Sequence, residues 1–246
     1  TEIYTLSLHD ALPIFVKHRM KITAIIPAAG SGERFGGKKQ LKRMGNRPLL
    51  FHTLQPFIAS ELITEIVVVV SKDDVYQVDR ELKSTISVKT VKVVSGGDTR
   101  QQSVFNGLKA ADKSSVLICV HDAVRPFVTE TLIDKVIQAC DQHDGVILAQ
   151  PSTDTIKKVM NDQILETLPR ETIWRAQTPQ VFTKQALLEA LELAESENIL
   201  RTDEASLLER IGYQVGFVEG SPTNIKITTE EDWVFAEAIY KSLNND

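Results

Sequence analysis

The sequence predicts an α/β fold of the Rossmann-like type, in which helices flank a mostly parallel sheet. Short apolar runs rich in β-branched residues alternate with longer helical stretches over most of the chain, which is typical of parallel strands joined by right-handed crossovers. Two of these runs lead into glycine-rich turns. One segment, at about residues 151–179, contains strand-like runs without an intervening helix, and it predicts a β-hairpin arm.

The composition is that of an ordinary globular protein. The chain has 246 residues, of which 42% are hydrophobic and 25% are charged, so it can bury the core of one large α/β domain. A formal net charge of −5 disfavours a general nucleic-acid-binding protein and favours a small anionic ligand at a local basic site. Cys119 and Cys140 lack the spacing of a redox pair or a metal site, and we expect both to be buried, reduced thiols.

The first 19 residues do not fit the α/β alternation. They precede Met20, and their cations, Lys17, His18 and Arg19, follow the apolar run instead of preceding it as in a signal peptide. We therefore predict an extraneous or disordered extension at residues 1–19 and a single domain at residues 20–246. Because no apolar run has the length of a membrane-spanning helix, we expect a soluble, cytoplasmic protein without membrane contact.

The first strand leads into the most informative loop of the chain. Residues 22–26 form a short apolar run that Pro27 ends, and four glycines follow between residues 30 and 37. Glycines allow backbone N–H groups to converge on an anion. Arg34, Lys38 and Lys39 add positive charge to the same loop. This combination indicates a site for a nucleoside triphosphate.

Three alternatives compete with this interpretation. A P-loop would need Ser or Thr at the position of Lys39 to hold magnesium, and neither is present. The dinucleotide-binding fingerprint fails because Gly30, Gly32 and Gly36 are spaced by one residue too many. The third alternative, a flexible surface turn with solvated cations, stays open on composition alone.

Two further strands are predicted to end in polar loops. Residues 65–71 form a strand, a helical stretch continues through Leu82, and the strand at 91–94 runs into Gly96 and Gly97. Asp98 is then expected to cap the next helix, whose first turns carry Ser103. All three loops would meet at the carboxyl edge of a parallel sheet, where α/β folds bind ligands.

The third loop follows a strand at residues 116–120. Asp122 is placed to hold Mg²⁺ or a ribose hydroxyl, although it could also only cap its own turn. His121 has no nearby nucleophile pattern or second histidine, so a buried, hydrogen-bonded role is as well supported as a catalytic one.

The remaining chain is predicted to complete the sheet and its helices. The hairpin joins residues 155–160 and 163–167 at Asn161-Asp162, and it needs a surface to pack on, for which a second subunit is one candidate. Thr228 and Glu231 are expected to form a capping box for the last helix, with Trp233, Ala236 and Tyr240 as core residues. The other predicted elements are helices at 132–141, 184–197 and 202–209 and strands at 146–149, 213–218 and 224–228.

Seven motifs occur in a fixed order: PAAGSGERFGGKKQ, GGDTRQQSV, VHDAVRPF, DTIK, AQTPQVF, TDEASLLE and NIKIT. From Met20 to the last helix they resemble the 2-C-methyl-D-erythritol 4-phosphate cytidylyltransferases of the non-mevalonate isoprenoid pathway. The resemblance implies a single nucleotidyltransferase domain with a projecting β-arm through which two copies form a homodimer. It also implies transfer of CMP from CTP to a sugar-alcohol phosphate, with Mg²⁺ or another divalent cation and with release of pyrophosphate.

The same resemblance assigns roles to individual residues. The catalytic positions are Arg34, Lys39, Arg170 and Lys226. The CTP-binding positions are Ala28, Ala29, Gly30, Gly97, Asp98, Ser103, Asp122 and Ala123, with Asp122 also as the metal ligand. The acceptor-binding positions are Arg125, Thr155, Arg170, Thr178, Thr202 and Lys226, with Arg170 reaching the site from the partner's arm. The family often has Pro where this chain has Lys38, which leaves open whether Lys38 or Lys39 serves the triphosphate.

The implied reaction asks for little covalent chemistry from the protein. A phosphate monoester is already anionic, so positioning and electrostatic stabilisation should dominate over general-base catalysis. A ribitol 5-phosphate cytidylyltransferase is an alternative, because that family shares the HDAVRP, TPQ and NIK elements; Ala29 and the TDEAS run favour methylerythritol phosphate. A non-catalytic nucleotide-binding module is a second alternative, disfavoured by the joint presence of Arg34, Lys39, Asp122 and Lys226.

Overall fold

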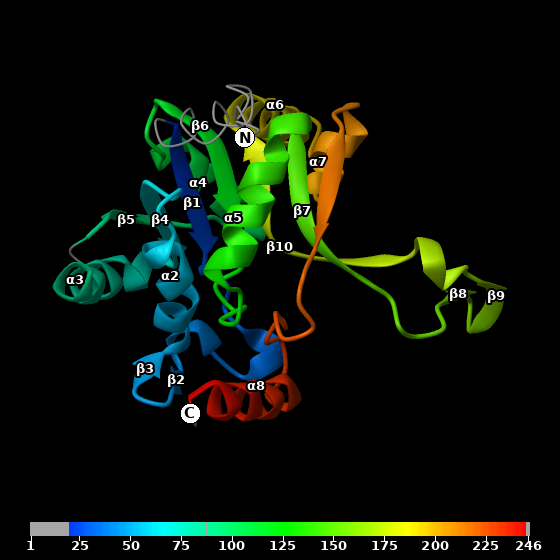
Figure 1. Cartoon of the computed structure of the whole chain (residues 1–246), viewed down its shortest axis with the longest axis horizontal. Helices are drawn as coiled ribbons and strands as arrows, with labels where there is room; N and C mark the ends of the chain where they lie inside the picture. The colour runs from blue at the N-terminus through cyan, green and yellow to red at the C-terminus, as the bar shows by residue number, and fades with distance from the viewer. Residues whose placement is uncertain (1–19, 87, 245–246) are drawn as a thin grey trace, which may run out of the picture.

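A seven-stranded sheet forms the centre of the molecule. The computed structural model describes residues 20–86 and 88–244, so the extension proposed for residues 1–19 lies outside the described residues. The strand order is β11-β7-β10-β6-β1-β4-β5. Figure 1 shows helices on both faces of this sheet and a hairpin, β8–β9, far to one side of it. The predicted α/β class is confirmed.

The strands of the sheet are parallel with one exception. Neighbours β1 and β4, β1 and β6, β4 and β5, and β7 and β11 pair in parallel, whereas β10 pairs antiparallel with both β6 and β7. The bounds are β1 Lys21–Pro27, β4 Glu65–Val70, β5 Thr90–Ser95, β6 Ser115–Val120, β7 Gly145–Pro151, β10 Trp174–Thr183 and β11 Val215–Glu219, with a small ladder of β2 Arg43–Met44 and β3 Arg47–Pro48.

Consecutive residues of the central strands point to opposite faces, and both faces are covered. On β1, Ala24 and Ile26 belong to one apolar cluster and Ile25 to the other. The first cluster includes side chains of α2, α3 and α5, and the second those of α4, α6 and α7. Because both faces are buried, the strand sequences are nearly continuous apolar runs. The helices are α2 Leu49–Ala59, α3 Val75–Thr85, α4 Arg100–Ala110, α5 Glu130–Ala139, α6 Lys184–Ser196 and α7 Ala205–Arg210.

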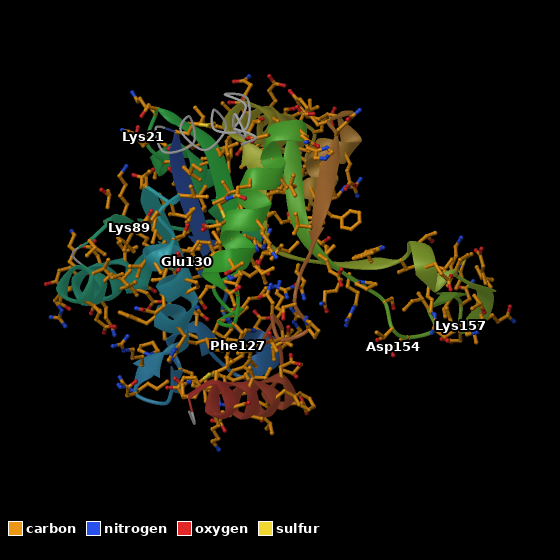
Figure 2. All side chains as sticks on the ribbon, viewed as in Figure 1. Lys21, Lys89, Phe127, Glu130, Asp154 and Lys157 are labelled. Carbon is orange, nitrogen blue, oxygen red and sulfur yellow. The ribbon has the colours of Figure 1, made fainter. Side chains whose placement is uncertain are left out.

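The last helix, α8 Glu230–Asn244, crosses the end of the molecule toward which β1 points (Figure 1). Trp233 and Ala236 of α8 are buried in a third apolar cluster with Phe35 and Phe127, which confirms them as core residues. Figure 2 shows Phe127 between the sheet and α8, and Lys21 at the far end of β1. This cluster holds the glycine-rich loop against the carboxyl edge of the sheet.

The sequence did not predict β10, although it lies near the middle of the sheet. Its sequence, WRAQTPQVFT, contains a proline and five polar residues, and its register with β7 shifts between Gln177 and Gln180. A strand with this irregularity shows no clear period of two. Only its neighbours, the buried strands β6 and β7, identify it as part of the sheet.

The predicted hairpin is confirmed as β8 Lys157–Met160 and β9 Gln163–Thr167. Asn161 and Asp162 connect the strands with φ values of 48° and 62°, a left-handed conformation that these residue types tolerate. Every residue of both strands is exposed. Figure 2 shows Asp154 and Lys157 on this arm, well away from the sheet.

Three local predictions were wrong by one residue or in type. Thr99, not Asp98, caps α4, because its side chain accepts a hydrogen bond from the N–H of Gln102. At α8 the reciprocal pair is Thr229 with Asp232 instead of Thr228 with Glu231, and the Asp232 carboxylate accepts hydrogen bonds from the N–H groups of Thr228 and Thr229. Residues 224–228 form no strand and are held by side-chain and single backbone contacts. A short polar side chain can cap from either of two adjacent positions, so sequence alone does not choose between them.

Within residues 20–86 and 88–244, no helix combines the length and the hydrophobicity needed to cross a membrane.

Candidate active site

A cavity of about 460 Å³ opens at the carboxyl edge of the sheet, where the glycine-rich loop, the loop after β5 and the loop after β6 meet. The three loops that the sequence analysis selected therefore line one cavity. Its walls are formed by Pro27, Ala28, Ala29, Gly30, Ser31, Gly32, Lys39, Gln40, Gly97, Asp98, Thr99, Arg100, Ser103, Asp122, Ala123, Val124 and Lys226.

The glycine-rich loop turns back on itself through two 3-10 helices, η1 Glu33–Phe35 and η2 Lys39–Leu41. Gly32 has a φ of 74°, and a Cβ atom there would lie 1.8 Å from the carbonyl oxygen of Gly37. Only glycine fits this approach. The amide of Gln40 donates hydrogen bonds to the carbonyl oxygens of Ala28 (2.8 Å) and Gly30 (3.0 Å), so the loop has a defined shape before any ligand arrives.

The two adjacent lysines of this loop point to different places. Lys39 lines the cavity, with its Nζ 3.4 Å from the carbonyl oxygen of Thr228. Burial, followed by the charges of Arg34 and Lys226, lowers the pKa of Lys39. Lys38 instead forms an ion pair with Asp74, 2.7 Å between Nζ and Oδ2, in the 3-10 helix η3 Lys72–Asp74 that follows β4. The geometry therefore selects Lys39 as the lysine available to an anionic ligand.

The loop after β5 supplies the opposite wall. The N–H of Gly97 donates to the Ser103 hydroxyl (3.2 Å), which itself donates to the carbonyl oxygen of Thr99 (2.9 Å). A Cβ atom at Gly96 would lie 2.5 Å from the side chain of Ala29, so the two glycine-bearing loops touch. Such a narrow, backbone-lined slot suits a flat ring whose edge is read by N–H and hydroxyl groups.

Asp122 sits at the floor of the cavity among three cations. Its carboxylate lies 2.8 Å from Lys226 Nζ, 3.0 Å from Arg100 Nε and 3.7 Å from Arg125 Nε. Burial alone would raise the pKa of Asp122, but Arg100, Lys226 and Arg125 hold it well below its ordinary value. The carboxylate is therefore ionised, and it orients the cations that surround it.

Arg100 and Glu204 were not among the site residues predicted from the sequence. Nη1 of Arg100 donates to both carboxylate oxygens of Glu204, at 2.7 and 2.9 Å, and Arg100 is a wall residue of the cavity. Arg100 is part of the GGDTRQQSV motif, but an arginine at the start of a helix does not by itself indicate a ligand-binding role. Its partners are 22 and 104 residues away along the chain, so no local pattern could have identified the pair.

Behind the cavity floor lie the buried residues Arg125, Thr178 and His121. Arg125 Nη1 donates to the carbonyl oxygen of Asn224 at 2.7 Å. The Thr178 hydroxyl accepts from the N–H of Asp122 and lies 3.0 Å from His121 Nδ1, while His121 Nε2 lies 3.0 Å from the carbonyl oxygen of Arg125. Burial lowers the pKa of His121 to about 4, so it is a neutral, hydrogen-bonded core residue at neutral pH.

Six of the residues singled out by the sequence do not line the cavity of one chain: Arg125 and Thr178, which lie behind its floor, and four that lie outside it. Arg34 is exposed beside it, close enough to affect Lys39. Thr155 and Arg170 are exposed on the arm, where Arg170 starts the 3-10 helix η5 Arg170–Thr172. Thr202 lines a separate shallow surface depression next to α7.

The cavity offers a metal few protein ligands. No cluster of three or more His, Cys, Asp or Glu side chains with metal-binding geometry occurs among the described residues. Asp98 and Asp122 are the only carboxylate side chains among the described wall residues. Mg²⁺ commonly binds through one or two carboxylates together with substrate phosphates, and this donor set fits that mode.

Comparison with known proteins points to one family. Residues 22–242 match the family model for 2-C-methyl-D-erythritol 4-phosphate cytidylyltransferase. The enzymes of that name from Halalkalibacterium halodurans and Geotalea uraniireducens are 43% and 41% identical to the chain, over 89% and 92% of its length and 97% and 100% of theirs.

Solved structures agree with the family match. The 4-diphosphocytidyl-2C-methyl-D-erythritol synthase of Anaerococcus prevotii superposes with a TM-score of 0.81 at 36% identity, over 90% of this chain and 99% of that one. The 2-C-methyl-D-erythritol 4-phosphate cytidylyltransferase of Thermus thermophilus superposes with a TM-score of 0.74 at 32% identity, over 89% of this chain and 98% of that one.

Proposed function

The chain belongs to the 2-C-methyl-D-erythritol 4-phosphate cytidylyltransferase family, and we propose that the cavity at the carboxyl edge of its sheet is where CMP passes from CTP to 2-C-methyl-D-erythritol 4-phosphate. The observation that carries this proposal is the convergence of three loops on one cavity with Lys39, Lys226 and Asp122 in its wall. One loop provides a glycine-rich cradle, one a narrow backbone slot and one a buried carboxylate surrounded by cations.

CTP would enter with its cytosine ring in the slot between the two glycine-bearing loops. Ala28, Ala29, Gly30, Gly97, Asp98 and Ser103 are wall residues of the cavity around this slot. Asp122 and Ala123, at the end of β6, would then lie near the ribose. The triphosphate would follow the glycine-rich loop toward Lys39.

The reaction would proceed by in-line attack of the acceptor phosphate on the α-phosphorus of CTP, with pyrophosphate as leaving group. The attacking phosphate is anionic near neutral pH, so the protein need not remove a proton. Its task is to hold two polyanions together and to stabilise the negative charge of the transition state. Lys39, Lys226 and the adjacent Arg34 would supply the positive charge for that task.

Mg²⁺, or another divalent cation, would be held mainly by the phosphates of CTP, with Asp122 as the protein carboxylate nearest to them. When bound, such an ion supplies charge neutralisation on the phosphate oxygens. Activity should be lost on chelation with EDTA and recovered on addition of MgCl₂; full activity in EDTA would contradict a metal requirement.

The acceptor side of the site would be completed by a second chain. Arg125, Thr178 and Lys226 lie at or behind the cavity, but Thr155 and Arg170 are exposed on the arm and Thr202 lies outside the cavity. We propose a homodimer in which the arm carries Arg170 to the partner's acceptor site. CTP use and two buried cysteines that form no disulfide in the described structure, Cys119 and Cys140, support a cytoplasmic location.

Complementation would test the shared site. Arg170→Ala and Lys39→Ala homodimers should each have strongly reduced activity, whereas a heterodimer of the two contains one site with both residues intact. Mixing the two variants should therefore restore measurable activity. A mixture as inactive as its components, or a monomer with full activity, would rule the shared site out.

Pyrophosphate release from CTP, Mg²⁺ and methylerythritol phosphate is the direct test of the function. Turnover is expected only with all three present. Folded protein that binds CTP without turnover would support the non-catalytic nucleotide-binding module. Turnover with ribitol 5-phosphate in excess over methylerythritol phosphate would support the other acceptor while retaining the cytidylyl-transfer mechanism.

A further inference from the structure

Glu204 is a buried carboxylate that does not line the cavity. It is 1% exposed and precedes α7 directly, in the position from which a side chain usually caps a helix. Its side chain makes no capping hydrogen bond. Both carboxylate oxygens instead accept from Nη1 of Arg100. Glu204 therefore does not cap the helix that it precedes, and its side chain instead contacts Arg100, 104 positions away in the chain.

The start of α7 is held by neighbouring residues without Glu204. Asp203 Oδ1 accepts from the N–H of Ser206 (3.2 Å), and the Gln180 side chain both accepts from the N–H of Ala205 (3.3 Å) and donates to Asp203 Oδ2 (2.9 Å). A buried ion pair is also weak evidence for stability, since desolvation offsets most of the attraction between its charges. Helix formation and stability therefore do not account for a carboxylate at this position.

Arg100 connects Glu204 to the cavity. It is the first residue of α4 and a wall residue of the cavity. While Nη1 binds Glu204, Nε donates to Asp122 Oδ1 at 3.0 Å. Among the described residues, none accepts a hydrogen bond from Nη2, and the side chain keeps 27% of its surface exposed. The planar guanidinium is thus fixed on two sides and presents its remaining edge to the cavity.

The negative charge of Glu204 affects both the protonation and the orientation of Arg100. Burial opposes the charged form of Arg100, but the carboxylates of Glu204 and Asp122 raise the pKa of Arg100 above its ordinary value. Without the charge of Glu204, Nη1 of Arg100 would lose its acceptor, and the guanidinium could turn further toward Asp122 or toward a phosphate. Either movement would disturb the arrangement of Asp122, Lys226 and Arg100 at the cavity floor.

On the basis of the function proposed above, we propose that Glu204 is a positioning residue for CTP: its carboxylate holds the Arg100 guanidinium in the orientation that fixes Asp122 and leaves one edge of Arg100 facing the nucleotide. Glu204 makes no contact with the nucleotide itself. Its effect passes through Arg100 alone.

The first test measures CTP affinity by calorimetry, together with KM and kcat, in Glu204→Gln. Glutamine has nearly the same shape but no charge. We expect CTP to bind about ten-fold more weakly or worse, since small displacements of positioning groups have effects of this size. The acceptor KM at saturating CTP should not change. Asp203→Asn, which alters the start of α7 without touching Arg100, is the matched control and should bind CTP as the wild type does.

A second measurement tests the route through Arg100. Arg100→Gln and the double variant Arg100→Gln/Glu204→Gln should bind CTP equally, because Glu204 has nothing left to position. If Glu204→Gln does not fold, Arg100→Lys keeps a cation beside Glu204 but loses the planar fork, and it should also weaken CTP binding.

The outcomes separate this inference from the proposed function. A wild type that neither binds CTP nor releases pyrophosphate would contradict the proposed function. With an active wild type, unchanged CTP affinity in Glu204→Gln or in Arg100→Lys, an equal loss in Asp203→Asn, or a further loss in the double variant relative to Arg100→Gln would each overturn the role of Glu204.

Discussion

The nucleotide cavity and the β-hairpin arm are built in opposite ways. In the cavity, Asp122 has cations from α4 and from residue 226 within 3.0 Å, and Arg100 is held by Glu204. On the arm, every residue of β8 and β9 is exposed, including the apolar side chains of Val159 (57%) and Ile164 (64%). The described part of one chain completes the first region and leaves the second without a packing surface.

The difference has an energetic reason. An isolated two-stranded hairpin is marginally stable in water, and a contiguous set of exposed apolar side chains indicates an interaction surface. Val159 and Ile164 are directly opposite each other in the register of β8 and β9, so they present a joint apolar face. We infer that nucleotide binding depends on one chain and that the arm depends on a partner.

The largest effect is expected at the cavity, for Lys39→Ala. Lys39 is the lysine of the glycine-rich loop that lines the cavity, and loss of one charge-stabilising donor typically lowers kcat by about 10²–10³-fold, roughly 3 kcal/mol. Steady-state measurement of pyrophosphate release gives this decrease in kcat. Lys38→Ala is the matched control: it removes a partly exposed ion pair with Asp74, of a kind worth about 0–1 kcal/mol. Equal losses in both variants would show that the lysines share the role.

The cavity floor should also make stability depend on pH. His121 has a pKa of about 4 in the folded chain and about 6.5 when unfolded. The unfolded state therefore binds the additional proton between these values, and the free energy of unfolding should fall by about 3 kcal/mol as the pH is lowered from 6.5 to 4. Urea unfolding at several pH values measures this loss.

His121→Gln separates this histidine from other titrating groups. Glutamine keeps a donor and an acceptor but does not titrate, so the variant should lose much less stability over the same interval. The arm segment 151–179 contains no histidine, and dimer dissociation should not follow the same pH dependence. Parallel stability curves for variant and wild type would contradict the assignment to the cavity floor.

A smaller effect is expected on the arm, for Ile164→Asp. Full burial of an isoleucine side chain contributes about 1.5–3 kcal/mol, so a charge at this position should weaken a dimer formed through the arm. Sedimentation equilibrium should show a shift toward monomer, with the thermal unfolding of the domain unchanged. Lys157→Asp, on the neighbouring strand β8 of the same arm but with a polar parent residue, serves as a control for added charge. An unshifted dimer would place the interface elsewhere.

The smallest effect concerns the choice of acceptor, where the two regions would meet. Methylerythritol phosphate and ribitol 5-phosphate carry the same charged group, so only pocket contacts of about 1–3 kcal/mol can separate them. We expect kcat/KM to favour methylerythritol phosphate by roughly ten-fold or more. Competition between both acceptors at limiting CTP measures the ratio directly, and excess ribitol product would reverse the assignment.

The sequence was most informative for the loops and turns, whose conformations depend on residues close together in the chain. Gly32, Gly97 and Asp122 each follow a recognisable strand within a few residues, and the chain's own topology brings these loops to one sheet edge. The hairpin turn at Asn161-Asp162 was also predicted, because a turn depends on adjacent residues only. In these places the controlling interactions span a few residues, so a pattern in the chain contains them.

The sequence by itself therefore determined the alternating α/β order, the three loops of the cavity and the hairpin. Only the tertiary structure decided which of Lys38 and Lys39 faces the cavity, that β10 lies antiparallel between β6 and β7, and that Arg100 joins Asp122 to Glu204. The physical reason is range: ion pairs and strand neighbours form between residues far apart in the chain, and their geometry exists only once the sheet has folded.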